Sequence, residues 1–399
     1  MAWEYPPYKV GGLGTHIEEL AQAQVQKGIS PIVIACSFEG KTGKTTENGV
    51  TVYRFDSDHL PAEDFPSWAL EMNILMYNQA AVAIAEEGNV DIIHAHDWIV
   101  SSCAVSLKHT YRIPLVSTIH SLEVGRRGGI YDDRQTLIND LEERMAYESW
   151  RVIACSHFMK QSISETFHTP WDKVDVIPNG VNIAKHEIQF NKDEIRSRYS
   201  LPHEKLILFV GRHVWEKGVD VALGAIPSVL KEIPDAKLVI VGHGYMTDKC
   251  KALAHHMGVG DKVCFTGYVD DWTVSALTKS SDVVIVPSRY EPFGIAALDA
   301  MACKTPVIVS DTGGLSEIVE HDKDGLKVWC GHSESLAHGI VRLLKDEALG
   351  KTLADNAYEK VSKIYSWNHV AELTNTVYGS IFEEYTKNSW KPKPIGSKN

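Results

Sequence analysis

The sequence lacks the features that would assign the protein to a membrane or to an oxidising compartment. No apolar run in its 399 residues approaches 18 residues, and no signal peptide is recognisable, so we expect neither a membrane span nor secretion. The seven cysteines form no CxxC pair and show no zinc-ligand spacing, and their odd number is typical of reduced, mostly buried thiols. A cytoplasmic protein is therefore expected.

Positive charge is scarce in the first half of the chain. Residues 1–180 carry 14 Lys and Arg against 24 Asp and Glu, and the remainder carries 26 against 28, which together give the net charge of −12. Such an acidic half is expected to bind nucleic acid and anionic membrane surfaces poorly. A neutral partner is the simpler expectation.

Three familiar nucleotide or metal motifs are absent or weak. The glycines at 11, 12 and 14 do not match the GxGxxG dinucleotide fingerprint. Gly40–Thr45 imitates a phosphate-binding P-loop, but the first Gly of that motif would fall at Phe38, and Asn48-Gly49 predicts a β-hairpin instead. Asp56-Ser57-Asp58 could hold a divalent metal, although short acidic turns are common on protein surfaces.

Strands and helices alternate in two successive series. The length and this alternation predict two α/β domains, residues 1–180 and 181–366, each a doubly wound parallel sheet. Only the last part of a first strand precedes Glu4, so we expect the natural chain to start several residues earlier. The polar residues 389–399, rich in Pro and Gly, are expected to form a disordered tail.

The most informative stretch is 283–317. It predicts, in order, a buried strand Val283–Val286, a turn Glu291–Gly294, a short helix Ile295–Ala302, a strand Pro306–Val309, a turn Asp311–Gly314 and a helix from Leu315. Amide groups at helix N-termini bind anions, so two such turns side by side suit a diphosphate. Glu291 and Asp299 add acceptors for sugar hydroxyls, although acidic residues here also complement the helix dipole.

Polar residues follow two predicted strands of the first half. Asp97 follows the strand expected at 90–94, and His120 follows the strand expected at 114–119, at the ends where open α/β sheets bind ligands. Asp97 is favoured as a functional residue. His94 and His96 could bind a metal, but no third ligand has diagnostic spacing, and a hydrogen-bonded core residue is the alternative for His94.

Basic residues occupy two further turns. Gly125–Gly129 is predicted to be a mobile basic loop whose Arg126 and Arg127 could help with a phosphate, although a solvated loop is favoured. Arg212 and Lys217 follow the strand expected at 206–210 and could neutralise a diphosphate.

Six motifs, taken together and in order, give the chain a resemblance to a known family. They are Lys9-Val10-Gly11-Gly12-Leu13, His96-Asp97-Trp98, Thr118-Ile119-His120, Gly211-Arg212 with Glu216-Lys217-Gly218, Glu291-Pro292-Phe293-Gly294, and Thr312-Gly313-Gly314-Leu315. Over nearly its whole length the sequence resembles the retaining, nucleotide-sugar-dependent glycosyltransferases of family 4, most closely glycogen and starch synthase-like members. The resemblance implies the GT-B fold, in which two Rossmann-like domains face a cleft and a last helix, here 367–388, crosses back to the first domain.

The resemblance also implies roles for individual residues. Asp97 and His120 would line the donor sugar and acceptor, Arg212 and Lys217 would stabilise the departing diphosphate, and Glu291 would lie beside the donor sugar. Contacts to the donor phosphates and sugar are expected from Lys9, Gly11, Gly12, Phe293, Gly294, Ile295, Thr312, Gly313 and Gly314. Contacts to the nucleoside are expected from Gly242, Gly244, Tyr245, Tyr268 and Asp299.

The reaction implied is transfer of a hexosyl group, most simply glucosyl, from a nucleotide diphosphate sugar to a sugar hydroxyl, as in glycogen or α-glucan synthesis. The family needs no obligatory metal or other cofactor, and the leaving phosphate would take the acceptor proton. Two alternatives stay open: the same chemistry on a sugar phosphate, small metabolite or lipid-linked glycan, and a catalytically weak glycan-binding relative. The nucleotide (UDP, ADP or GDP) and the oligomeric state are also open.

One position departs from the family pattern. The second of the family's paired glutamates, which contacts ribose hydroxyls, is Asp299 in this chain. Because Asp is one methylene shorter, we expect weaker donor binding without loss of the chemistry.

Overall fold

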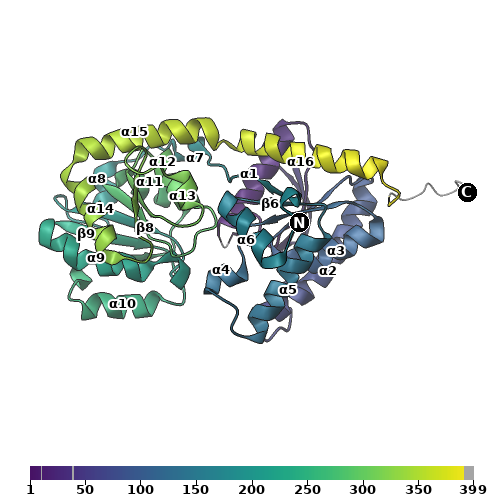
Figure 1. Ribbon diagram of the computed structural model, residues 1–399, viewed down its shortest axis with the longest axis horizontal. Helices are drawn as coiled ribbons and strands as arrows, with labels where there is room; N and C mark the ends of the chain where they lie inside the picture. The colour runs from purple at the N-terminus through teal and green to yellow at the C-terminus, as the bar shows by residue number, and fades with distance from the viewer. Residues whose placement is uncertain (10, 38–39, 391–399) are drawn as a thin grey trace, which may run out of the picture. The chain divides into compact units, whose positions relative to one another are not determined.

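The computed structural model describes residues 1–9, 11–37 and 40–390, which form two compact units (Figure 1). The first unit contains Met1–Asn179 and the chain from Trp367 onward, and the second contains Gly180–Ser366. Val10, Phe38 and the part of the predicted tail from residue 391 lie outside the described residues.

The first unit contains two hydrogen-bonded groups of strands, a parallel group in the order β4-β5-β6-β7 and a group in the order β1-β3-β2. Their bounds are β1 Ile32–Ser37, β2 Gly43–Glu47, β3 Val50–Asp56, β4 Ile93–His96, β5 Leu115–Ile119, β6 Arg151–Ala154 and β7 Val174–Val176. The first two residues of the chain join the groups. The Met1 carbonyl accepts the amide of His96 at 3.2 Å, and the amide of Ala2 donates to the carbonyl of Ile34 at 3.2 Å.

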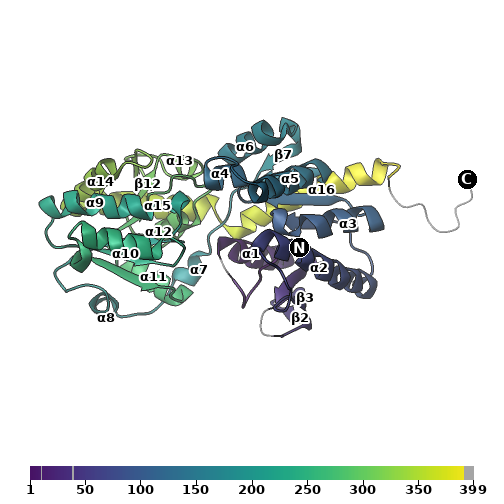
Figure 2. The same ribbon diagram turned by 90° about the horizontal axis from the view of Figure 1, so that it is seen from below.

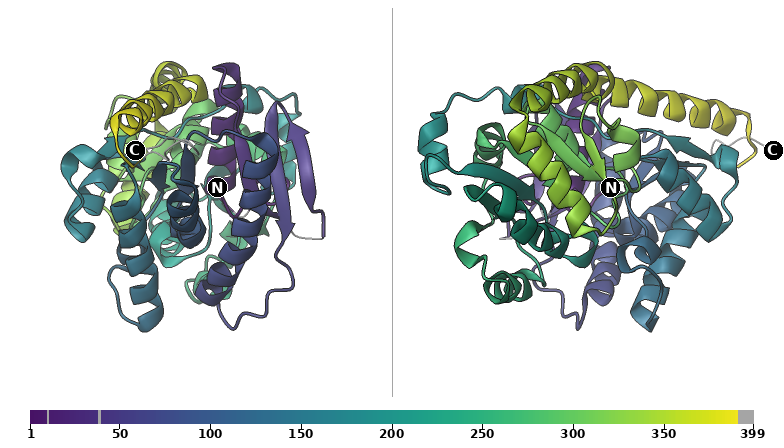
Figure 3. Two further views of the ribbon diagram at one scale, coloured as in Figure 1. Left: turned by 90° about the vertical axis from the view of Figure 1, so that its right-hand side faces the viewer. Right: turned by 60° about the vertical axis from the view of Figure 1, so that its left-hand side comes forward.

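The predicted hairpin is confirmed (Figures 2 and 3). β2 runs antiparallel to β3, and Glu47 pairs with Val50. The loop residues Asn48 and Gly49 have φ values of 50° and 83°, and a tight type I′ turn requires positive φ at both positions. Because Gly43–Glu47 is a strand of this hairpin, the P-loop interpretation is excluded.

The helices of the first unit are α1 Gly12–Gln26, α2 Phe65–Glu87, α3 Ser101–Tyr111, α4 Glu123–Arg127, α5 Asp133–Glu148, α6 His157–Phe167 and α16 Trp367–Lys387. The C-terminal helix α16, yellow in Figure 1, packs against α1. Its side chains Trp367, Val370, Ala371, Val377 and Ile381 follow the 3.6-residue period and are buried in one core with residues of α1 and β5. The last helix is therefore part of the first unit's core.

The prediction of a mobile loop at Gly125–Gly129 is wrong. Glu123–Arg127 forms the short helix α4. The guanidinium of Arg126 donates to Glu123 at 2.9 Å and to Glu142 at 2.8 Å, and Glu142 is 1% exposed. A buried carboxylate must be paired, so Arg126 serves the structure of this helix.

Two smaller predictions also need correction. β4 spans Ile93–His96 and not 90–94, so the strand continues through both histidines. Trp390, which the sequence assigns to the disordered tail, contacts the rings of Trp150 and Tyr385, with centroids 6.0 and 6.1 Å away. None of the helices in the described part of the chain is long and apolar enough to cross a membrane.

The second unit is built on one six-stranded sheet in the order β10-β9-β8-β11-β12-β13, and every pair in it is parallel. The strands are β8 Lys205–Val210, β9 Ala236–Val241, β10 Val263–Gly267, β11 Val283–Val286, β12 Val307–Ser310 and β13 Leu326–Val328. The order runs outward from β8 to β10 on one side and from β11 to β13 on the other. The reversal between β8 and β11 is where sheets of this kind bind ligands.

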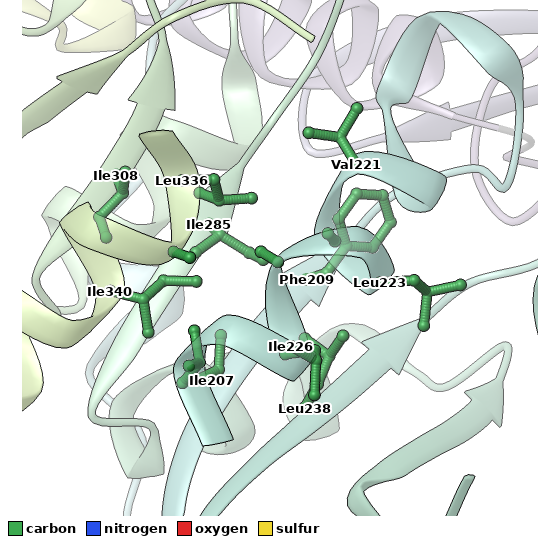
Figure 4. Packing of buried hydrophobic residues seen from close by; sticks show 14 of the residues in the cluster. Ile207, Phe209, Val221, Leu223, Ile226, Leu238, Ile285, Ile308, Leu336 and Ile340 are labelled. Carbon is green, nitrogen blue, oxygen red and sulfur yellow. The ribbon is translucent and has the colours of Figure 1, made fainter. Parts of the chain in front are cut away.

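Helices of the second unit pack on this sheet and on one another. They are α7 Ile183–His186, α8 Lys192–Ser197, α9 Val219–Glu232, α10 Thr247–His256, α11 Asp271–Ser280, α12 Ile295–Ala302, α13 Leu315–Ile318, α14 Ser333–Lys345 and α15 Glu347–Ile364. Figure 4 shows the core beneath α9 and α14, where Ile207 and Phe209 of β8 face Ile226 of α9 and Ile340 of α14. Each fully buried side chain of this size contributes about 1.5–3 kcal/mol, so the core holds the strand ends in fixed positions.

Candidate functional site

In the second unit, the turns after β8 and β11 meet at the reversal of strand order. Lys217 lies in the first turn and Glu291 in the second, and the Lys217 ammonium is 2.7 Å from the Glu291 carboxylate. Glu291 is 7% exposed, and its carboxylate also accepts the hydroxyl of Ser288 at 3.0 Å. The ammonium and carboxylate are therefore fixed at the point where the sheet topology predicts a ligand.

Close backbone packing holds these two turns together. Gly218 has a φ of +68°, and a Cβ added there would lie 2.0 Å from the carbonyl oxygen of Pro287. Arg289 strengthens the contact through hydrogen bonds to both carboxylate oxygens of Asp220 at 2.7 and 2.8 Å. Only glycine fits at position 218 without moving one turn from the other.

Arg212 is arranged differently from Lys217. Its side chain is 57% exposed, and its closest carboxylate contact is 3.5 Å, to Glu216. The guanidinium is therefore accessible to solvent and to a bound anion, whereas Lys217 is already paired.

The turns before α12 and α13 lie against each other. The amide of Gly314 donates to the carbonyl of Glu291 at 2.9 Å. A Cβ at Gly314 would lie 2.5 Å from the Cα of Phe293 and 2.6 Å from the carbonyl oxygen of Pro292, so the approach needs glycine. The amides of Phe293 and Gly294 have no acceptor in the described part of the chain, and Ile295 begins α12 immediately after them. Thr312 and Gly313 complete the second turn, and the Thr312 hydroxyl donates to the Arg289 carbonyl at 3.3 Å.

Asp299 lies one turn inside α12 and pairs with His186 of α7, whose Nε2 is 3.3 Å from the carboxylate. The other ring nitrogen of His186 is 3.0 Å from the hydroxyl of Ser275. Burial alone would lower the pKa of His186, but hydrogen bonds to Asp299 and Cys303 outweigh it and raise the pKa to about 10. The imidazole is therefore protonated at neutral pH, and the Asp299 side chain remains 37% exposed beside it.

Four of the five residues predicted to contact the nucleoside, namely Gly242, Gly244, Tyr245 and Tyr268, follow β9 and β10. The turns are hydrogen-bonded to each other, because the amide of Gly242 donates to the carbonyl of Gly267 at 2.9 Å. Gly244 begins a tight turn closed by Thr247, whose hydroxyl accepts the Gly244 amide at 3.0 Å. Tyr245 and Tyr268 are 64% and 82% exposed, so both rings are available for stacking.

In the first unit, Asp97 and His120 directly follow the adjacent strands β4 and β5. The Asp97 carboxylate accepts the amide of His120 at 2.7 Å. Asp97 has a φ of 60°, which is rare for a residue with a side chain and costs about 1–3 kcal/mol. Burial raises the pKa of Asp97 to about 6, although Arg126 opposes this shift.

Histidines gather next to this pair. His16 of α1, His96 of β4 and His120 lie in mutual ring contact, and the Nδ1 of His96 is 3.1 Å from the Nε2 of His120. Burial lowers the pKa of His16 and His96 well below 6.5, and it lowers the pKa of His120 to about 3, so all three are neutral at pH 7. His94 instead uses both ring nitrogens, on Tyr378 at 2.6 Å and Thr118 at 2.7 Å, which confirms the interpretation of His94 as a hydrogen-bonded residue.

The glycine-rich segment before α1 is anchored by acidic side chains. The Gly11 amide donates to the carboxylate of Glu4 at 3.1 Å, and Glu4 is 3% exposed. The Lys9 ammonium lies 3.8 Å from the carboxylate of Glu18. Gly12 is the first residue of α1.

Sequence reasoning missed three contributors to these clusters. His16 and His186 reach their partners through tertiary packing, whereas Ser288 is only three residues from Glu291, and none of the three stands in a motif. The available signal for His16 was a histidine on the apolar face of a predicted helix, which by itself is typical of a core residue.

The fold and the turns together define a class of enzyme. Two Rossmann-like units with parallel strands, and with polar turns where these strands end, are the architecture of GT-B glycosyltransferases. Residues 10–185 match the family model described as Glycosyltransferase Family 4, and residues 191–360 match the model described as Glycosyl transferases group 1.

Relatives place the chain within that class. It is 41% identical over 382 residues to an uncharacterized glycosyltransferase of Methanocaldococcus jannaschii, covering 95% of this chain and 96% of the relative. It is 31% identical over 395 residues to a glycogen synthase of Mycobacterium tuberculosis, covering 95% and 93%. The fold is similar to that of Anabaena HepE in complex with UDP-glucose, with a TM-score of 0.74 at 19% identity, covering 93% of this chain and 97% of that one. The protein belongs to the GT-B glycosyltransferases of the glycogen synthase-like kind.

Proposed function

We propose that the protein transfers a glucosyl group, with retention of configuration, from a nucleotide diphosphate sugar to a hydroxyl of an α-glucan. The observation that carries this proposal is the ion pair of Lys217 and Glu291 at the reversal of strand order, with Arg212 exposed in the same turn. The similarity to a glycogen synthase supports an α-glucan acceptor, and HepE, with UDP-glucose bound, supports a nucleotide-sugar donor.

Departure of the diphosphate is the costly part of this reaction, because negative charge accumulates on the leaving oxygen. Preorganised cations and amides aimed at that charge are the largest single source of rate enhancement in such sites. In our proposal, Arg212 and Lys217 contact the diphosphate, and the amides of Phe293, Gly294 and Ile295 bind phosphate and sugar oxygens. Thr312, Gly313 and Gly314 support the same contacts from the neighbouring turn.

Glu291 has two tasks in this proposal. Its carboxylate holds the Lys217 ammonium in position before the donor binds, and its remaining lone pairs accept hydroxyls of the donor sugar. A cation that is already oriented loses little entropy when the diphosphate arrives, so little of its attraction for the diphosphate is spent on ordering the side chain. Asp299, Gly242, Gly244, Tyr245 and Tyr268 contact the nucleoside.

The first unit contributes Asp97, His120 and the segment with Lys9, Gly11 and Gly12. The neutral imidazole of His120 donates or accepts a hydrogen bond with a sugar hydroxyl, and the Asp97 carboxylate orients it through its backbone amide. The leaving phosphate takes the acceptor proton, so the chemistry requires neither a covalent enzyme nucleophile nor an obligatory metal.

A panel of donors and acceptors tests this function. UDP-, ADP- and GDP-glucose are each incubated with maltooligosaccharides, glucose 6-phosphate or inositol phosphate, in buffer with and without EDTA, and nucleotide release is measured. We expect release with a glucose donor and maltooligosaccharide, unchanged by EDTA, and an α-configured product by proton NMR. If nucleotide is released only with a phosphorylated acceptor, that compound and not a glucan is the acceptor. If a glycan binds but no nucleotide is released, the proposed activity is contradicted.

A further inference from the structure

The histidine cluster in the first unit has the composition of a metal site. His16, His96 and His120 come from three separate elements, and each offers one ring nitrogen within 4.8 Å of the other two. Three imidazoles with an open fourth position form a recurrent protein site for zinc, and imidazole also suits copper and nickel.

One ring nitrogen of His16 has a hydrogen-bond partner, and the other has none among the described residues. Its Nδ1 is 2.8 Å from the side-chain oxygen of Asn179, so Nδ1 carries the proton and donates it. Nε2 therefore keeps its lone pair. His16 is 5% exposed, and Nε2 has no hydrogen-bond partner among the described residues. Leaving a buried polar atom unpaired costs about 1–3 kcal/mol, so this one requires an explanation.

The hydrogen bond between His16 and Asn179 is of the kind that metal-binding histidines make. Metal-binding histidines usually donate their second N–H to a carbonyl or carboxylate oxygen, which fixes the ring orientation and the tautomer. The bond from His16 to Asn179 has this form. His94 stacks on His96 with ring centroids 4.2 Å apart, yet both of its nitrogens are already bonded, so it is excluded as a ligand.

We propose that His16, His96 and His120 bind one divalent transition-metal ion, with Zn²⁺ as the reference ion, through one imidazole nitrogen each. Three atoms at most 4.8 Å apart can all be reached by an ion within about 2.8 Å of each. A zinc–nitrogen bond is about 2.0–2.1 Å, so each ring moves inward by roughly 0.7 Å on binding. His96 and His120 share one proton in their hydrogen bond. On metal binding this proton moves to the other nitrogen of the ring that carries it, so both imidazoles stay neutral and the charge of the protein does not change.

The site has a consequence for the transfer reaction that rests on the proposed function. His120 contacts the donor sugar in that function, and binding of the metal would draw its ring inward by roughly 0.7 Å, away from the position that this contact requires. Metal binding therefore inhibits transfer, which is compatible with a reaction that needs no metal itself.

The test is metal binding, which is independent of activity. Metal-free full-length protein is titrated with Co²⁺, followed by its visible absorption, and then with Zn²⁺ in competition. We expect one equivalent to bind. Asn179→Ala should weaken binding by about 10–100-fold, because it frees the His16 ring, and His16→Phe should weaken it at least as much. His94→Gln is the matched control from the same stack and should bind like the unmodified protein.

X-ray absorption at the zinc edge gives a second measurement that does not depend on a folded variant. Three imidazoles at about 2.0 Å are expected for the unmodified protein. Binding of less than one equivalent would overturn the proposal. Equal affinity in Asn179→Ala, His16→Phe and the control would also overturn it, because the ion would then occupy surface histidines.

Discussion

The ion pair between Lys217 and Glu291 supports a prediction that separates structure from catalysis. Replacing Lys217 with Met keeps the length of the side chain but removes the charge that is 2.7 Å from Glu291. The side chain of Glu291 is only 9% exposed, so its carboxylate becomes a buried charge with the Ser288 hydroxyl at 3.0 Å as its remaining described partner. Removing one member of a fully buried pair costs about 3–5 kcal/mol, and because Lys217 is 24% exposed we expect about 1–3 kcal/mol.

The stability assay is a double-mutant cycle with Lys217→Met, Glu291→Gln and the double variant, measured by urea unfolding. A neutral Gln no longer needs the ammonium, so the double variant should recover most of the stability lost by Lys217→Met. The expected coupling energy is about 1–2 kcal/mol.

The activity assay on the same variants should give the opposite pattern. The double variant is as inactive as Lys217→Met, with turnover lowered about 10²–10³-fold, because the cation facing the leaving diphosphate is absent in both. Strictly additive stabilities would refute the structural half of this reasoning, and recovery of turnover in the double variant would refute the catalytic half.

Three further predictions follow from the same unit. Arg212→Ala should lower turnover about 10²-fold without changing stability, because its side chain is 57% exposed; a loss of stability with normal turnover would contradict its assigned role. Asp299→Glu should lower the Michaelis constant for the donor, and an unchanged constant would mean that Asp299 does not contact the ribose. The pKa of His186 is raised from 6.5 to about 10, so the pair with Asp299 stabilises the fold fully below pH 6.5 and progressively less as the pH rises to about 10. The unfolding midpoint should therefore decline over this pH range, and His186→Gln should flatten the decline. An unaltered profile in this variant would show that another group causes the decline.

Local sequence pattern was sufficient to predict much of the second unit. The strand Val283–Val286 and the helix Ile295–Ala302 have the predicted bounds. Both are short apolar segments bounded by residues that stop a strand or begin a helix, namely Pro287 and Gly294, so neighbouring residues in the chain determine where they end. The hairpin at Asn48-Gly49 was predictable for the same reason.

Features that depend on distant contacts were not predictable. The segment after His120 is a helix because Arg126 reaches Glu142, which is 16 residues away, whereas its glycines suggested a loop. His16 meets His120 across 104 positions of the chain, and Asp299 meets His186 across 113. No spacing rule connects such residues, because the fold of the sheet brings them together.

In the proposed function, the turns after β8 and β11 bind the diphosphate of the donor. A crystal structure of the full chain with UDP or ADP tests this most directly. We expect a phosphate oxygen within about 2.7–3.2 Å of the Lys217 ammonium and of the amide of Phe293 or Gly294, with Arg212 turned toward it. A nucleotide bound elsewhere, with no phosphate at the Lys217–Glu291 pair, would contradict it.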